Sequence, residues 1–190
     1  MFGRHGSHTI RRPIELRIQN VGQLFQTLDP TPFRERDLDA GVEEYVVGWA
    51  GEMGGKHPLS IVIHLPKSEA RHEGAVHIGD AFRNYFIYRA EVLGWELHTL
   101  FRTGREALAI GLLVLGCCIL IGEKTAGLLG GSYLPNVFGE GLIILGWVAN
   151  WRPIEIFLYD WQPIVRRRAL YRRLAQARVD VVVGDGPAPA

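Results

Sequence analysis

Cysteine is almost absent from this sequence. Its only two cysteines, Cys117 and Cys118, are adjacent and lie inside an apolar stretch. A disulfide framework needs pairs of cysteines that can reach each other, and a zinc site needs spaced Cys and His ligands. Two neighbouring cysteines satisfy neither requirement, and they fit better as small packing residues. We therefore predict no metal and no cofactor for this chain.

Familiar catalytic and nucleic-acid-binding signals are also missing. The sequence has no Gly-rich phosphate loop, no GxSxG elbow, no HExxH and no paired CxxC. The histidines between positions 57 and 77 match no standard zinc spacing. The formal net charge is only +1, and no nucleic-acid recognition module is present. An enzyme therefore has no positive support, and we expect no nucleic-acid partner.

Charge itself is missing from the stretch 107–122, ALAIGLLVLGCCILIG, which also contains no proline. As a helix, these 16 residues rise about 24 Å, and the hydrocarbon core of a bilayer is about 30 Å thick. A run this short also suits a buried helix of a soluble protein. A second apolar stretch and flanking basic residues favour a transmembrane helix over about 106–123.

A second span is predicted over about 140–159, with charged residues in its second half. Ionisable groups at membrane depth are costly, so Arg152 and Glu155 around Pro153 form a candidate intramembrane polar site. Their i, i+3 spacing allows them to pair. Alternatively, the span ends near Trp151 and the following segment lies along the inner interface.

Basic residues lie outside both spans. Arginines near a span mark the cytoplasmic side, so both termini are predicted to be cytoplasmic, which requires an even number of spans. Two is the consistent count. The arginines after the second span are also candidate contacts for anionic lipid headgroups. These residues are Arg166, Arg167, Arg168, Arg172 and Arg173.

The first hundred residues are a mixed polar region with short periodic segments. Apolar residues alternate over 14–19 and again over 58–66, which predicts two strands. Between them, apolar positions from Leu38 to Trp49 recur at helical spacing, with Asp37 as the expected N-cap and Glu43 outside the apolar face.

A long helical pattern then begins near Val76 and runs without proline into the first span. The predicted fold class is therefore α+β: a small cytoplasmic domain of two strands and helices, continuing through this helix into a two-helix transmembrane hairpin. An isolated two-stranded sheet is marginal, so a partner or a second copy could add strands. The predicted segments are a flexible basic leader (1–12), the α+β domain (13–100), the hairpin (101–162) and a basic cytoplasmic tail (163–190).

Two groups of polar residues are candidates for docking a partner. The loop 29–39 is dense in charge, so it is either a docking or catalytic loop or a capped helix start with solvated charges. A polar stripe on the long helix either binds a partner or solvates the helix. The residues concerned are Asp29, Arg34, Arg36 and Asp37 in the loop, and Arg83, Asn84 and Arg89 in the stripe.

Four segments carry a resemblance to other proteins: LDPTPFRERDLD, PLSIVIHLP, AFRNYFIYRAE and ILGWVANWRPIEIFLYDWQPIVRRRALYRRL. With them, most of residues 13–178 resembles a group of uncharacterised bacterial two-span inner-membrane proteins. The resemblance implies a bacterial inner-membrane protein, but it brings no activity and no catalytic residue.

These observations favour a non-catalytic accessory or scaffold protein, in contact with membrane lipid, that presents its cytoplasmic domain to a protein partner or forms a homo-oligomer. One alternative is a subunit of a channel or transporter with Arg152 and Glu155 at an intramembrane site. A second alternative is a membrane-bound enzyme that uses the loop 29–39.

Overall fold

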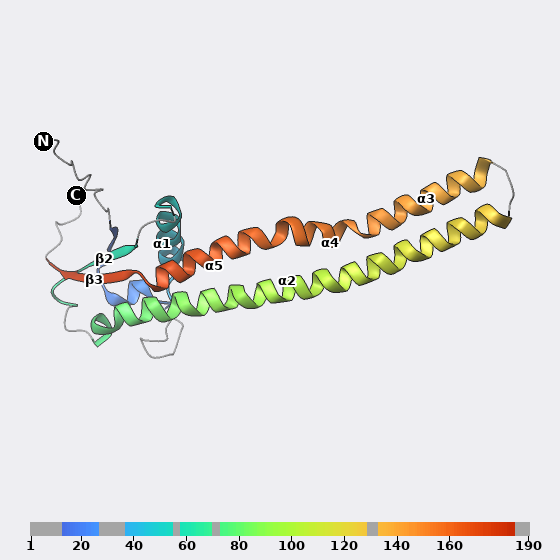
Figure 1. Cartoon of the computed structure of the whole chain (residues 1–190). Coiled ribbons are helices and arrows are strands. Elements are labelled where there is room, and N and C mark those ends of the chain that lie inside the picture. The colour runs from blue at the N-terminus through green and yellow to red at the C-terminus, as the bar shows by residue number, and fades with distance from the viewer. Residues whose placement is uncertain (1–12, 27–36, 55–57, 70–72, 129–132, 185–190) are drawn as a thin grey trace, which may run out of the picture. The chain divides into compact units, whose positions relative to one another are not determined.

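The computed structural model describes residues 13–26, 37–54, 58–69, 73–128 and 133–184. The fold is mostly helical, with one small sheet (Figure 1). In chain order, the elements are β1 (Ile14–Arg17), the 3-10 turn η1 (Val21–Leu24), α1 (Ala40–Glu52), β2 (Ser60–Leu65), α2 (Glu73–Leu128), α3 (Tyr133–Ala149), α4 (Trp151–Glu155), the π-helical turn η2 (Ile156–Asp160), α5 (Trp161–Ala175) and β3 (Arg178–Val183).

The chain divides into two compact units. The α+β unit comprises the described residues among 1–90 and 169–190, and the helical unit comprises residues 91–168. The α+β unit therefore takes residues from both ends of the chain. Helix α2 contributes residues to both units.

The sheet has three parallel strands in the order β1-β2-β3. Ile61 of β2 is paired with Ile14 of β1 on one side and with Val179 of β3 on the other. Ile14, Ile61 and Ile63 are buried, as alternate residues on one face of a sheet should be. The α+β fold class and the two expected strands are confirmed.

The prediction of a two-stranded sheet is wrong, because β3 lies within the segment 163–190, which was expected to be only a basic tail. The sequence RVDVVV is rich in β-branched residues, which favour strands. Its neighbour β2 is more than a hundred residues earlier in the sequence. That pairing is a tertiary event, which local periodicity does not reveal.

The N-cap of helix α1 lies two residues after the predicted cap, Asp37. Its N-cap is Asp39, whose side chain accepts a hydrogen bond of 2.9 Å from the Gly41 amide. Asp37 cannot take this role because an antiparallel bridge between Phe25 and Leu38 keeps the backbone extended there. The Gln26 amide donates to the carbonyl of Asp37 in the same bridge.

The long helix is confirmed: α2 runs for 56 residues without interruption. It ends at Leu128 and α3 begins at Tyr133, so most of the expected apolar turn over 126–138 is helical. Two of the described helical segments, Ala75–Thr125 and Val137–Ala175, are long and apolar enough to cross a membrane. Only 11% and 22% of their most apolar windows are buried, whereas a core helix of a soluble protein would be mostly buried.

Candidate functional site

Within the helical unit, α2 packs closely against the segment from α3 to α5, and glycines make this approach possible (Figure 1). A Cβ atom added to Gly146 would lie 3.0 Å from the Cα atom of Leu115, and one added to Gly104 would lie 2.9 Å from Ile156 Cγ2. Larger side chains at these positions would force the backbones apart. Small residues at such contacts are typical of helix pairs in membranes.

Asn150 forms a polar link at the centre of this helix pair. It is only 5% exposed and lies at the break between α3 and α4. Its side-chain amide donates hydrogen bonds to the carbonyl of Gly111 on α2, at 3.0 Å, and to the carbonyl of Gly146 on α3, at 2.9 Å. Asn150 therefore bonds across the pair and within its own helix.

The break at Asn150 follows from Pro153. Proline has no backbone N–H, so the carbonyl four residues earlier, that of Ala149, loses its helical donor. This carbonyl and Asn150 Oδ1 both lie against Gly111, at 3.0 and 2.7 Å from the position a Cβ atom would occupy. Asn150 Oδ1 accepts no hydrogen bond from the residues that the structure describes. Glycine is thus the only standard residue type that fits at position 111 without displacing Asn150.

The predicted polar site at Arg152 and Glu155 lies on the outer surface of the helix pair. Arg152 pairs with Glu155 at 2.9 Å and also with Asp160 at 3.1 Å, and the side chains of Arg152 and Glu155 are 60% and 45% exposed. Pro153 is buried. Sequence reasoning therefore identified an ion pair but missed Asn150, the neighbouring buried polar residue. An asparagine three residues before a proline in an apolar segment was the available signal.

At each end of the helix pair, charged residues of α2 lie beside charged residues of the partner helices. At one end, Arg102 pairs with Glu106 at 3.0 Å, and Gly104 between them faces Ile156, next to the Arg152–Asp160 group. At the other end, the contact between Gly122 and Gly139 lies beside Glu123, Lys124 and Glu140.

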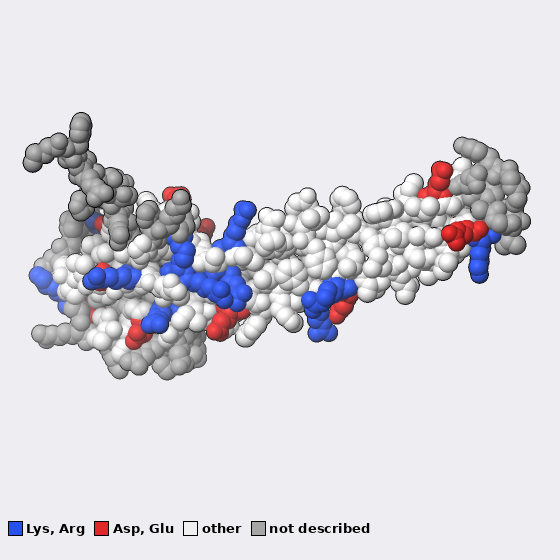
Figure 2. All heavy atoms as spheres, viewed as in Figure 1, with Lys and Arg blue, Asp and Glu red and all other residues white. Residues whose placement is uncertain are grey.

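No charged residue lies between these levels, over 107–122 on α2 or over 141–151 on the partner helices. We call this part of the helical unit the apolar band. Figure 2 shows a stretch of the unit without charged side chains on the face in view. Large apolar side chains are exposed here on both helices: Ile110, Leu112, Leu113, Ile119, Leu120, Ile121, Ile143, Ile144, Leu145, Trp147, Val148 and Trp151.

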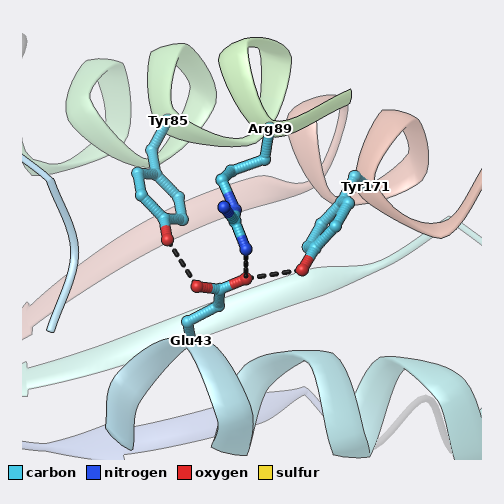
Figure 3. A network of polar contacts seen from close by, with 4 residues as sticks. All are labelled: Glu43, Tyr85, Arg89 and Tyr171. Atoms are coloured by element: carbon cyan, nitrogen blue, oxygen red, sulfur yellow. Dashed lines mark hydrogen bonds and ion pairs between the residues drawn. The ribbon is translucent and has the colours of Figure 1, made fainter. Parts of the chain in front are cut away.

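The α+β unit contains a different polar site, centred on the carboxylate of Glu43 (Figure 3). Its Oε2 accepts a hydrogen bond of 2.5 Å from the hydroxyl of Tyr85 on α2. Its Oε1 accepts one of 2.5 Å from the hydroxyl of Tyr171 on α5 and one of 3.2 Å from Arg89. We call these four residues the Glu43 network. It connects three helices of the α+β unit through one carboxylate.

The electrostatics of the network favour an ionised Glu43. Burial opposes ionisation, but the hydrogen bonds from Tyr171 and Tyr85 and the positive charge of Arg89 outweigh it, so the pKa of Glu43 is lowered. Burial, together with the hydrogen bond to Glu43 and its negative charge, raises the pKa of Tyr85. Tyr85 therefore remains a neutral donor at physiological pH and is no candidate for a proton-transfer group.

The network fits a structural role better than a catalytic one. Tyr171 is buried, and its ring stacks on Phe86 with centroids 5.9 Å apart. The expectation that Glu43 lies outside the packed face of α1 is wrong, and Arg89, expected on a docking stripe, is paired with Glu43. The sequence signal was absent because a glutamate at a polar position of a helix is usually solvated.

The remaining docking and lipid candidates are dispersed. Asp29, Arg34 and Arg36 lie outside the described residues. Arg83 and Asn84 are exposed on α2. Of the arginines near α5, Arg166, Arg167 and Arg172 are exposed, Arg168 lies against Gly94 of α2, and Arg173 donates to the Gly54 carbonyl at 2.6 Å.

Neither a metal-ligand cluster among the described residues nor a likeness to other proteins identifies a site. Among the described residues, no three His, Cys, Asp or Glu side chains gather as a metal ion would require. Comparison with protein-family models, with curated proteins and with solved structures finds no match to this chain. The function must therefore be argued from the geometry of the two units.

Proposed function

We propose that this chain is an integral membrane protein of the accessory or scaffold class. In this proposal the helical unit is a two-span anchor, and the α+β unit is presented to a protein partner in the aqueous phase. The apolar band carries the proposal. Its 16 residues on α2 measure about 24 Å, close to the hydrocarbon thickness of about 30 Å once the flanking residues enter the headgroups.

The outward direction of the apolar side chains supports lipid contact. A soluble monomer rarely exposes a contiguous apolar patch of more than a few hundred Å². Each exposed Å² of apolar surface costs about 25 cal/mol in water. Here most large apolar side chains of both helices are exposed along the band, and its buried positions are taken by Gly111, Cys118, Gly146 and Asn150. Lipid is the solvent that suits such a surface.

The distribution of arginines supports an orientation with both termini cytoplasmic, as in a bacterial inner membrane. The contact between Gly94 and Arg168 brings both ends of the helical unit to one side of the apolar band. That side carries the arginines, whereas Lys124 is the single basic residue beside the other end. Positive residues mark the cytoplasmic side. The arginines of that side are Arg102, Arg105, Arg152, Arg166, Arg167 and Arg168.

The channel or transporter alternative has less support. A conducting path needs polar groups that face an interior, but Arg152 pairs with Glu155 and Asp160 on the exposed surface at one edge of the apolar band. At this edge the Arg152 side chain can reach the headgroups, as long basic side chains commonly do. The interior of the helix pair is filled by close backbone contacts around Gly111 and Gly146.

The anchor is tested by membrane fractionation together with a cysteine cross-link. We expect the protein to leave membranes only with detergent. In a Cys117→Ser/Cys118→Ser background, Gly122→Cys and Gly139→Cys should form a disulfide on mild oxidation, because a Cβ at Gly122 would lie 3.5 Å from Gly139 Cα. The control pair replaces Gly139→Cys with Gly141→Cys, since nothing lies within 4 Å of a Cβ there. Recovery in the soluble fraction without detergent would contradict the anchor.

The accessory role is tested by affinity purification of the tagged chain from membranes in mild detergent. A stoichiometric companion, identified by mass spectrometry, would support the role and name the partner. A purified chain with no companion, in which Arg152→Gln abolishes an ion flux in liposomes, would instead favour the channel.

A further inference from the structure

Helix α2 has a second long face in the helical unit, opposite the face that packs against α3 to α5. The packed face includes Gly104, Gly111 and Cys118, which recur at a spacing of seven residues and are buried. Ala109 and Leu113 lie two residues before and after Gly111, and at about 100° per residue this turns them to the far side of the helix. Residues that recur in steps of four and three continue this far side in both directions. We call them the seam: Trp95, Thr99, Arg102, Glu106, Ala109, Leu113, Gly116, Leu120 and Glu123.

The seam is an exposed surface with the composition of a helix–helix contact. Trp95, Leu113 and Leu120 on it are 66%, 67% and 60% exposed. Nothing lies within 4 Å of a Cβ atom on Gly116, so packing within the described residues does not require a glycine there, although glycine weakens a helix relative to alanine. Small residues such as Gly116 and Ala109 allow membrane helices to approach closely. The composition of the seam therefore suits contact with another helix.

The charged residues of the seam make it complementary to itself. At one end of the apolar band, Arg102 Nε lies 3.0 Å from Glu106 Oε1, which brings the two charges to one level, and their side chains are 71% and 61% exposed. A parallel copy of the helix can therefore place its own Arg102 against this Glu106, and the four side chains then alternate in sign. At the other end of the band, Glu123 and Lys124 are about 100° apart, on the two flanks of the seam. Across a parallel pair, the flank with Glu123 faces the flank with Lys124 of the other copy.

We propose that α2 pairs along the seam with α2 of a second copy of this chain, in parallel and around a two-fold axis that runs along the helices. Such an axis follows the bilayer normal, so both copies keep the same orientation in one membrane, as the two-span anchor requires. Leu113 and Leu120 then form layers with their equivalents, and Ala109 and Gly116 leave room between the backbones. This isologous arrangement is the commonest form of homodimer.

The seam is long enough for such a pair. From Trp95 to Glu123 it rises about 42 Å, or about four heptads, which is a length over which this spacing indicates a coiled coil. Two copies anchored in one bilayer also meet at a raised effective concentration, which favours their association. The inference thus deepens the proposed function by naming a second copy as a partner, and it rests on that function for the shared bilayer.

The first test is disulfide cross-linking of single-cysteine variants of the full chain in liposomes. In a Cys117→Ser/Cys118→Ser background, Leu120→Cys should form a disulfide-linked dimer on mild oxidation, because seam residues face their equivalents across the two-fold axis. The control is Ile121→Cys, which lies at nearly the same depth and is 50% exposed but points away from the seam. It should cross-link at least about fivefold less. Equal cross-linking at the two positions would indicate random collision in the lipid and would overturn the inference.

The second test measures energy transfer between donor-labelled and acceptor-labelled copies in liposomes. Arg102→Glu leaves two acidic residues at this level of the seam, and Glu106→Arg leaves two basic ones. Each variant alone should associate about tenfold more weakly than wild type, because ion pairs between the copies become repulsions. The control, Arg166→Glu, makes the same charge change as Arg102→Glu at an exposed position of α5 and should leave association unchanged.

Mixing the two seam variants gives the decisive result. Donor-labelled Arg102→Glu with acceptor-labelled Glu106→Arg should restore energy transfer, because an acidic seam then meets a basic one. Losses that mixing does not restore, or seam variants that behave like Arg166→Glu, would contradict the pairing. Detergent-dependent extraction of the same samples tests the membrane anchor by itself, so the two proposals fail separately.

Discussion

Removing one hydroxyl group from Tyr171 tests the Glu43 network with little other disturbance. The Tyr171→Phe variant keeps the buried ring and its stacking on Phe86. It removes the 2.5 Å hydrogen bond to Glu43 Oε1, which still accepts from Arg89. No buried acceptor is therefore left without a donor, and the change measures the hydrogen bond rather than a desolvation penalty.

The expected loss is about 2 kcal/mol in the free energy of unfolding of the α+β unit. A hydrogen bond to a charged group contributes about 1.5–3 kcal/mol, more than one between neutral groups. Because 1.4 kcal/mol is a factor of ten in an equilibrium constant, the population of the opened unit should rise about 30-fold.

Amide hydrogen exchange of the full chain in detergent, read by mass spectrometry, measures this opening. Exchange should accelerate about 30-fold in peptides from α1 and β3, and remain unchanged in peptides from 107–122. The control is Tyr45→Phe, which removes an exposed 3.4 Å hydrogen bond to the Glu15 carbonyl and should change exchange less than about threefold. Equal effects of the two variants would refute the role of the network.

Three further predictions concern the same two units. Because the pKa of Glu43 is lowered in the fold, its ionisation stabilises the α+β unit above the ordinary value of 4.5, and this contribution is lost as the pH falls through the lower folded value. Denaturant titrations should therefore show the stability difference between wild type and Glu43→Gln narrowing under acid, and a constant difference would contradict the prediction. Gly111→Val should lower the thermal unfolding midpoint in detergent by several degrees because it displaces Asn150, whereas Gly116→Val, with nothing within 4 Å, should not. Asn150→Leu should cost about 0.6–2 kcal/mol in the same assay through its two lost hydrogen bonds, and an unchanged midpoint would show that they contribute nothing.

Local pattern was enough to predict the elements whose signals are periodic in sequence. The alternation around Ile14 and Ile61 predicted β1 and β2, and the uninterrupted helical pattern from Val76 predicted α2. The run 107–122 predicted an apolar helix by composition alone. In each case the regular repeat of the backbone determines which nearby residues are apolar, so a short window of sequence is enough to recognise the element.

Tertiary structure alone decided which distant residues meet. Glu43 and Tyr171 are 128 positions apart, and their hydrogen bond depends on the return of the chain to the α+β unit. The third strand depends on the same return, since the long helices lie between β2 and β3 in the sequence and the two strands pair directly. Asn150 likewise gains its role from Gly111, 39 positions earlier. Such a contact produces no repeating pattern in the sequence. It needs only one polar residue, at the position that the fold brings next to its partner.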